Sequence, residues 1–172
     1  MEQYLDKIVN ILAVVGIIDT ILIIIGLIYG FVLWSRGIFP ALYRLGNGLG
    51  KRKIAIFAKN DNLRSIRCLL LDSKLFKLKN IIEITSGNDL GKAEESSVYL
   101  VYWHDWNDEI NEILSNKPDG YPMVVYAPYN KGRIPDDQME KLDGKRNTSV
   151  TNFRGRLLND ILTAMITTGY SK

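Results

Sequence analysis

Four segments of this chain together offer aromatic, amide and cationic side chains, and each of them ends or follows a short apolar run. Aromatic rings stack on nucleobases, while Lys and Arg side chains bind phosphate groups. The mixture therefore predicts a site for a nucleotide or a short oligonucleotide. The candidate ligand-binding residues are Lys59, Asn60, Trp103, His104, Trp106, Tyr129, Lys131, Arg133, Arg154 and Arg156.

A second chemical feature is an ionisable side chain inside a long apolar run. The run extends from Ile8 to Trp34, and Asp19 lies near its centre. As a helix it would be roughly 40 Å long, enough to cross a hydrocarbon core of about 30 Å. A carboxylate at the centre of such a helix costs roughly 2.5 to 3.5 kcal/mol, so it normally faces a helix bundle or a wet cavity. We expect Asp19 to line or gate a polar path.

Small and polar residues in the same run indicate that copies of the helix associate. Gly26 and Gly30 form a GxxxG pair, and Gly16 with Thr20 repeats the spacing of small residues that lets helix backbones approach closely in lipid. We therefore expect a homo-oligomer, and the alternative role for Asp19 is to specify assembly alone. The positions assigned to the pore or to helix association are Asn10, Gly16, Asp19, Thr20, Gly26 and Gly30.

The charges that flank the run predict its orientation. No acidic residue occurs between Asp19 and Asp61, whereas that interval carries several cations. The positive-inside bias then places the domain that follows in the cytoplasm. The run is too long for an ordinary signal peptide, and the residues before it are acidic overall. We expect a single-pass protein of the inner (cell) membrane, bound to membrane lipid.

The rest of the chain has the size of one compact domain. The predicted division is an N-terminal segment with the transmembrane helix (1–35), a basic juxtamembrane linker (36–52) and a cytosolic domain (53–172). From Ile54 to Lys172 there are 16 basic and 16 acidic residues, so double-stranded DNA is not an expected partner. The single cysteine, Cys68, excludes a disulfide within one chain and fits a reducing compartment.

Short apolar strands alternate with helical stretches after residue 53, which favours a parallel sheet covered on both faces. The predicted fold class is α/β: a single N-terminal transmembrane helix followed by a flavodoxin-like five-stranded parallel sheet in the order 2-1-3-4-5. Ligands of such sheets bind beyond the carboxyl ends of the strands, near the switch between strands one and three. Strands are expected at 53–58, 80–85, 97–103, 121–127 and 147–153, and helices at 61–76, 106–116, 135–143 and 154–168.

Several chemistries are disfavoured by the absence of their motifs. FAKNDN, after the first predicted strand, has neither the GxGxxG nor the Walker pattern, and no GxSxG signature occurs. His104 is the only histidine and Cys68 the only cysteine, so a zinc site within one chain is not expected. We expect no metal and no cofactor other than the nucleotide-like ligand.

The domain resembles the Toll/interleukin-1 receptor (TIR) group of flavodoxin-like domains. The likeness lies in KIAIFA, SVYLVYW and the helix start Trp106-Asn107-Asp108-Glu109. TIR enzymes that cleave NAD carry a glutamate in a pattern like S-x-W-C-x-x-E, so the resemblance implies Glu109 as the catalytic carboxylate. Here Glu109 follows Trp106 by three positions instead of four, the cysteine is absent, and Asp108 and Glu112 compete for the role.

The layout of one membrane span and one small nucleotide-sensing domain resembles the transmembrane effectors of bacterial antiphage systems, with the Hailong-type channel effector as the nearest architecture. The resemblance implies a nucleotide or oligonucleotide made by a partner nucleotidyltransferase, which controls an oligomeric transmembrane channel. Two alternatives stay open at this point. One is a membrane-tethered enzyme that cleaves NAD through Glu109, and the other is a non-enzymatic membrane adaptor.

Overall fold

A computed structural model describes residues 2–168 of the chain, except for the side chains of residues 2–6, 8–11, 44, 47 and 48. The chain divides into two compact units, Met1–Tyr43 and Arg44–Lys172. The flavodoxin-like domain lies in the second unit, so the fold there is what positions the candidate site.

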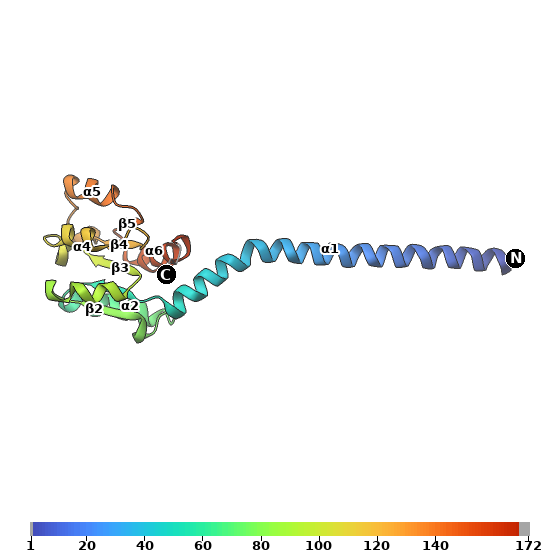
Figure 1. Cartoon of the computed structure of the whole chain (residues 1–172), viewed down its shortest axis with the longest axis horizontal. Coiled ribbons are helices and arrows are strands. Elements are labelled where there is room, and N and C mark those ends of the chain that lie inside the picture. The colour runs from blue at the N-terminus through green and yellow to red at the C-terminus, as the bar shows by residue number, and fades with distance from the viewer. Residues whose placement is uncertain (1, 169–172) are drawn as a thin grey trace. The chain divides into compact units, whose positions relative to one another are not determined.

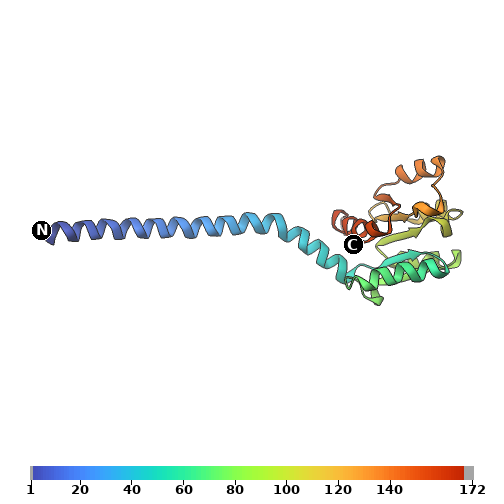
Figure 2. The ribbon, with the colours of Figure 1, turned by 180° about the vertical axis from the view of Figure 1, so that it is seen from behind.

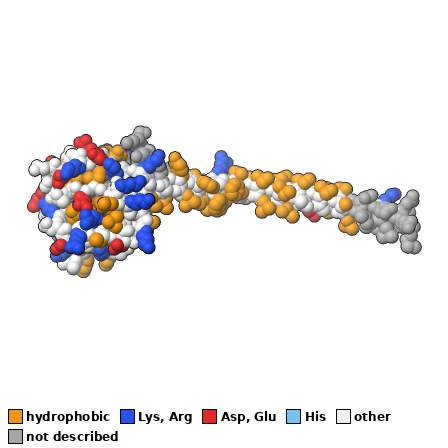
Figure 3. All heavy atoms as spheres, turned by 90° about the horizontal axis from the view of Figure 1, so that it is seen from below, with side chains coloured by type: hydrophobic (Ala, Val, Ile, Leu, Met, Phe, Trp, Pro, Cys, Tyr) orange, Lys and Arg blue, Asp and Glu red, His pale blue; other side chains and the backbone are white. Residues whose placement is uncertain are grey.

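The first unit consists of the greater part of one long helix, α1 (Glu2–Lys51). Within it, the 32-residue stretch Leu12–Tyr43 is long and apolar enough to cross a membrane, and none of its most apolar window is buried. Hydrophobic side chains cover the described part of this stretch in Figure 3. The chain therefore has one N-terminal candidate membrane helix, as the apolar run predicted.

The expected linker at 36–52 is helical instead, since α1 continues to Lys51 with Pro40 inside it. The sequence indicated a linker there, whereas the chain stays helical through Pro40 and the glycines around it. A proline removes one backbone hydrogen bond, and an isolated glycine costs only about 1 kcal/mol relative to alanine. An apolar environment also favours internal pairing of every backbone N–H and C=O group.

The second unit is an α/β domain built on one five-stranded sheet in which every neighbouring pair is parallel. The strand order is β2-β1-β3-β4-β5, which confirms the predicted flavodoxin-like winding (Figure 1). The strands are β1 (Ile54–Phe57), β2 (Ile81–Ile84), β3 (Val98–Tyr102), β4 (Met123–Tyr126) and β5 (Thr148–Thr151).

Helices connect the strands and cover both faces of the sheet. The α-helices are α2 (Asn60–Asp72), α3 (Trp103–Trp106), α4 (Ile110–Asn116), α5 (Asp136–Asp143) and α6 (Arg154–Thr167), and the 3₁₀ helices are η1 (Leu78–Asn80), η2 (Gly87–Glu95) and η3 (Tyr129–Lys131). Every predicted strand and helix is present within a few residues. The sequence indicated neither a helix nor a strand between β2 and β3, and this stretch forms η2.

Two buried clusters hold these layers together. On one face of the sheet, Phe57, Tyr99 and Val125 pack against residues of η2, α3, α4 and α5. On the other face, Leu70 of α2 and Ile161 of α6 pack against Ile56 and its neighbours. Figure 2 shows the ribbons of α2 and α6 from this side. The three central strands, β1, β3 and β4, are buried along their whole length, as a parallel sheet covered on both sides requires.

A buried arginine joins the start of β1 to the end of α6. Arg52 is only 4% exposed, and its guanidinium donates hydrogen bonds to the Met165 carbonyl (3.1 Å), the Thr168 hydroxyl (3.2 Å) and the Thr168 carbonyl (2.9 Å). A cation at a helix C-terminus also interacts favourably with the helix dipole. The carbonyl of Arg52 accepts a hydrogen bond from the buried amide of Asn80 at 3.1 Å. Arg52 therefore connects three parts of the domain.

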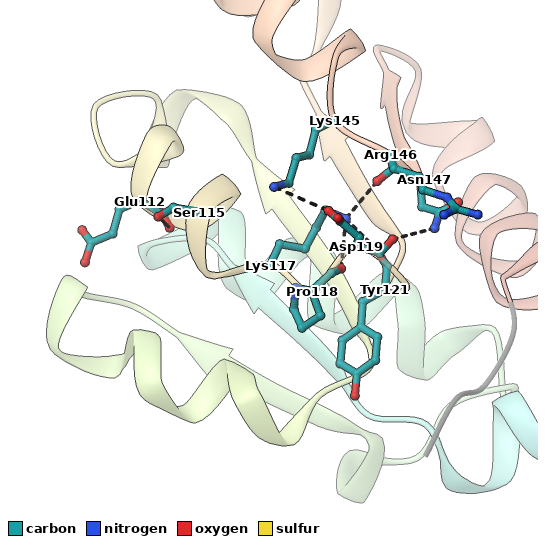
Figure 4. A network of polar contacts seen from close by, with 9 residues as sticks. All are labelled: Glu112, Ser115, Lys117, Pro118, Asp119, Tyr121, Lys145, Arg146 and Asn147. Carbon is teal, nitrogen blue, oxygen red and sulfur yellow. Dashed lines mark hydrogen bonds and ion pairs between the residues drawn. The ribbon is translucent and has the colours of Figure 1, made fainter.

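A buried lysine ties together the loops that precede β4 and β5. The Lys117 ammonium donates to the carbonyls of Tyr121 (2.8 Å), Arg146 (2.9 Å) and Pro118 (3.3 Å), and Figure 4 shows these contacts. Burial lowers the pKa of Lys117 from its ordinary value, and the nearby cation Lys145 lowers it further, while Asp119 raises it. These loops lie at the amino ends of the strands, so Lys117 is a structural group remote from the candidate site.

Candidate functional site

The carboxyl ends of β1 and β3 are joined by the carboxylate of Asp105. Its Oδ2 atom accepts a hydrogen bond from the Lys59 backbone N–H at 2.7 Å, and Oδ1 accepts one from the Asn62 amide at 3.0 Å. Asn60, the first residue of α2, is exposed and has φ +50°, a conformation that Asn tolerates better than most residues. Asp105 thus fixes the start of α2 against α3.

The side chains above this junction also interact with one another. The Lys59 ammonium lies 4.9 Å from the centre of the Trp106 ring and 3.5 Å from the Glu109 carboxylate. Trp106 is fully buried and packs edge-on against Phe57, with ring centres 5.6 Å apart. At the predicted switch point between β1 and β3, these residues bind one another.

The buried tryptophans are not positioned as stacking platforms. Trp106 is 0% exposed and Trp103 is 3% exposed, and both belong to the core cluster under α4 and α5. The exposed aromatic rings at this end of the sheet are Tyr129, at 80%, and Phe153, at 56%. The Tyr129 backbone N–H donates to the Asn152 carbonyl at 3.3 Å, which places the segments that carry the two exposed rings side by side.

An apolar hollow of about 380 Å³ opens at the carboxyl ends of β4 and β5. That volume lies in the lower part of the range of small-molecule pockets, roughly 300 to 1,000 Å³. Tyr129 and Arg133 contribute polar groups to an otherwise largely apolar wall. We call it the apolar hollow; its lining consists of Ala127, Tyr129, Gly132, Arg133, Ile134, Met139, Val150 and Asn152.

A second hollow, of about 370 Å³, shares Arg133 with the first and is lined mainly by polar atoms. It lies between the loop after β3 and the start of α5. Arg133 is exposed, and its guanidinium pairs with Asp136 at 2.7 Å. We call it the polar hollow; its lining consists of Trp103, His104, Asn107, Asp108, Arg133, Pro135, Asp137 and Gln138.

His104 forms one wall of the polar hollow. Its ring lies 6.1 Å from that of Tyr102, and a Cβ atom at Gly132 would be 4.0 Å from its Cε1 atom. Gly132 has φ +107°, which a residue with a Cβ atom rarely adopts. The Nε2 atom of His104 is buried and has no hydrogen-bond partner among the described residues.

The surroundings of His104 favour its neutral form. Burial lowers its pKa from the ordinary value of 6.5, Asp105 raises it, and Lys131 lowers it again. Since the folded state binds a proton less readily than the unfolded state, stability rises with pH through this window and is lost as pH falls from about 6.5 toward the folded pKa.

We expect a histidine titration of the full chain in detergent micelles to have its midpoint below 6.5. The chain has only one histidine, so nitrogen NMR of histidine-labelled protein reports His104 alone. Lys131→Met should move the midpoint upward, because it removes a nearby positive charge. A midpoint at or above 6.5 would contradict the partial burial of the ring.

The other cations that were predicted to bind the ligand lie at different places around the carboxyl edge of the sheet, which we call the rim. Arg154 donates to the Ser65 hydroxyl (2.6 Å) and to its carbonyl (3.0 Å), and so joins α6 to α2. Arg156 is exposed on α6 and forms no ion pair with a described residue. Lys131 is exposed in η3 near His104. Of the predicted ligand-binding residues, Trp103, His104, Tyr129 and Arg133 line the two hollows.

The predicted catalytic residue Glu109 immediately precedes α4. Its carboxylate pairs with Lys59 and is about one-third exposed, and Glu109 lines neither hollow. No group of His, Cys, Asp and Glu side chains among the described residues could hold a metal ion.

In the candidate membrane helix, the residues predicted for the pore or for helix association have no neighbours from elsewhere in the described chain. Asp19 is exposed, and a Cβ atom at Gly16, Gly26 or Gly30 would meet no described atom within 4 Å. The Thr20 hydroxyl donates to the Gly16 carbonyl at 2.7 Å, within its own helix. The side chain of Asn10 lies outside the described residues.

Sequence reasoning missed Ile134, Gln138 and Met139, which line the hollows from the loop before α5 and from α5 itself. Pro135 and the acidic residues after it did predict a helix start there. No residue pattern indicated that this short helix would border a cavity.

The chain matches no protein-family model, no curated protein and no solved structure. Its function therefore has to be inferred from the geometry of the candidate site.

Proposed function

We propose that this chain is a membrane-anchored sensor whose cytosolic domain binds a nucleotide-like ligand and controls the association of its membrane helices. The observation that carries the proposal is the apolar hollow at the carboxyl ends of β4 and β5, with the exposed Tyr129 ring among its lining residues. Ligands of open α/β sheets bind at this edge, and an exposed aromatic ring can stack on a base.

In this proposal, the membrane helix responds to ligand binding by changing its association with other copies of the helix. An ionisable residue such as Asp19 is costly in lipid unless other helices or water surround it, and small residues permit close helix contacts. The cations after the span support a cytoplasmic domain, in the inner membrane, by the positive-inside bias. Ligand binding can shift the assembly only as far as its affinities for the two assembly states differ.

We further propose that the protein acts as an effector of bacterial antiviral defence, with a homo-oligomeric channel opened or closed by a ligand from a partner nucleotidyltransferase. The support for this step is the layout of one candidate membrane helix followed by one domain with a ligand-sized hollow.

The test is reconstitution of the full chain in liposomes of phosphatidylethanolamine and phosphatidylglycerol that contain a fluorescent dye. Addition of the common ribonucleotides is expected to change dye release by about tenfold or more, and Tyr129→Ala should remove the response. Asp19→Leu should abolish release but leave ligand binding intact, while Ile23→Leu serves as the matched control in the same helix. Ligand binding without any change in release or oligomeric state would favour a membrane adaptor instead.

Asp19→Asn separates the two roles proposed for this residue. The amide keeps hydrogen-bonding capacity but carries no charge. If Asp19 conducts or gates ions, Asp19→Asn should retain the oligomer and change ion flux. Unchanged oligomerisation together with unchanged flux would assign Asp19 to assembly alone.

We propose binding in preference to NAD cleavage because Glu109 pairs with Lys59 and lies outside both hollows. Incubation of the oligomeric full chain with NAD tests this choice. Consumption of NAD that is lost in Glu109→Gln would establish the enzymatic alternative.

A further inference from the structure

The two hollows are suited to different halves of one ligand. They share Arg133, so a single molecule can extend from one into the other. The apolar hollow offers Ile134, Met139 and Val150 as a surface for a flat apolar group such as a base. The polar hollow offers hydrogen-bonding groups around the largely buried ring of Trp103.

Two polar atoms beside the polar hollow have no hydrogen-bond partner among the described residues. They are Nε2 of His104 and Oε1 of Gln138, and both are buried. A buried polar group without a partner costs about 1 to 3 kcal/mol, so a ligand that satisfies it gains affinity. Both residues line the polar hollow, and a rotation about their terminal torsions, which are soft, is needed to turn these atoms toward it.

Hydroxyl groups suit this pair of atoms. A hydroxyl can donate to the Gln138 oxygen, and it can also donate to or accept from a histidine nitrogen. The two neighbouring hydroxyls of a ribose supply one such group for each atom. His104 and Gln138 would then select for the sugar, while the apolar hollow holds the base.

The charges around the hollows limit the number of phosphates. The described lining contributes one guanidinium, Arg133, which already pairs with Asp136, and two carboxylates, Asp108 and Asp137. Lys131 is the further cation near His104. Of the other predicted cations, Lys59 pairs with Glu109 and Arg154 binds Ser65, while Arg156 lines neither hollow. A polyphosphate would lie beside carboxylates with few cations to neutralise it.

We infer that the ligand is a ribonucleoside or a ribonucleoside monophosphate, with its base in the apolar hollow and its ribose hydroxyls on His104 and Gln138. This inference rests on the proposed binding of a nucleotide-like ligand and not on its supply by a nucleotidyltransferase, and it narrows the nucleotide or oligonucleotide class to ligands with at most one phosphate. His104 and Gln138 are then the residues that determine specificity for the sugar.

The experiment measures binding to the full chain in detergent micelles, with the His104 NMR signal as the reporter. The probes are the four common ribonucleosides, their 5′-monophosphates, their 5′-triphosphates and a tetra-adenylate. For at least one base, the nucleoside or monophosphate should bind about tenfold or more tightly than the triphosphate and the tetra-adenylate. Raising salt from about 50 to about 200 mM should change its Kd by less than about threefold, unlike binding through many phosphate contacts.

Two comparisons test whether the ribose hydroxyls bind His104 and Gln138. The 2′,3′-dideoxy form of the preferred nucleoside should bind about fivefold to tenfold more weakly, a test that needs no protein variant. Gln138→Leu should weaken the ribonucleoside to a similar extent and leave the dideoxy form nearly unchanged. Lys141→Met, at an exposed position of the same helix, is the matched control and should affect neither probe.

Other outcomes would overturn the inference, and they distinguish its failure from failure of the proposed function. Tighter binding of the triphosphate or tetra-adenylate, with a steep salt dependence, would refute the limit on phosphates but leave a nucleotide sensor in place. Equal binding of the ribo and dideoxy forms would refute the ribose assignment. If none of the probes bound, the nucleotide-sensing function itself would fail.

Discussion

Arg52→Met is expected to lower the free energy of unfolding of the α/β domain by about 2 to 4 kcal/mol. The substitution removes three hydrogen bonds from a buried, charged guanidinium to Met165 and Thr168 at the end of α6. Hydrogen bonds to charged groups contribute about 1.5 to 3 kcal/mol, and the buried acceptors that remain would lose a partner. The end of α6 should therefore detach first.

Lys53→Met is the matched control, because it removes the neighbouring cation at an exposed site. Lys53 pairs with Glu95 at 2.8 Å, but exposed ion pairs contribute only about 0 to 1 kcal/mol. Urea unfolding of the full chain in detergent micelles, followed by tryptophan fluorescence, compares the variants. Equal stabilities of the two variants would show that Arg52 does not hold α6.

Trp106→Ala is expected to destabilise the domain by about 3 to 5 kcal/mol, the usual cost of removing a large aromatic side chain from a core. Trp106 is fully buried against Phe57 and beneath the Lys59 ammonium. Circular dichroism during thermal unfolding provides the measurement, because it does not depend on the tryptophan that has been removed.

Tyr129→Ala provides the contrast, since its ring is exposed at the apolar hollow. An exposed substitution of this kind usually changes stability by less than about 0.5 kcal/mol. We expect it to weaken ligand binding instead. A Trp106→Ala protein with normal stability but no nucleotide binding would restore the sequence prediction that Trp106 stacks on a base.

The strands could be predicted because burial on both faces of a parallel sheet requires nearly continuous apolar runs. KIAIFA and SVYLVYW satisfy that requirement, and the alternation of such runs with helical stretches indicated the strand order. The candidate membrane helix could be predicted for a related reason, since its apolar run has no periodicity that would suit a soluble helix.

The details of the site could not be predicted, because they depend on the direction in which each side chain points. Trp103 was expected at the end of a strand, but the chain turns into α3 there, so that Trp103 and Trp106 both enter the core. Asp105 was an unremarked loop residue until the fold placed it beside the Lys59 backbone. Nothing in the local sequence predicts contacts between residues so far apart along the chain.

The position of Arg52 also determines when the domain can be completed during synthesis. Its hydrogen-bond partner Thr168 lies 116 residues later in the chain. At about 5 to 20 residues per second, ribosomes need roughly 6 to 23 s to make that stretch. The candidate membrane helix is synthesised before this interval begins, so its insertion into a bilayer can precede closure of the domain by α6. A nascent chain halted before residue 168 should therefore be bound to membranes but sensitive to protease in the domain that follows the helix.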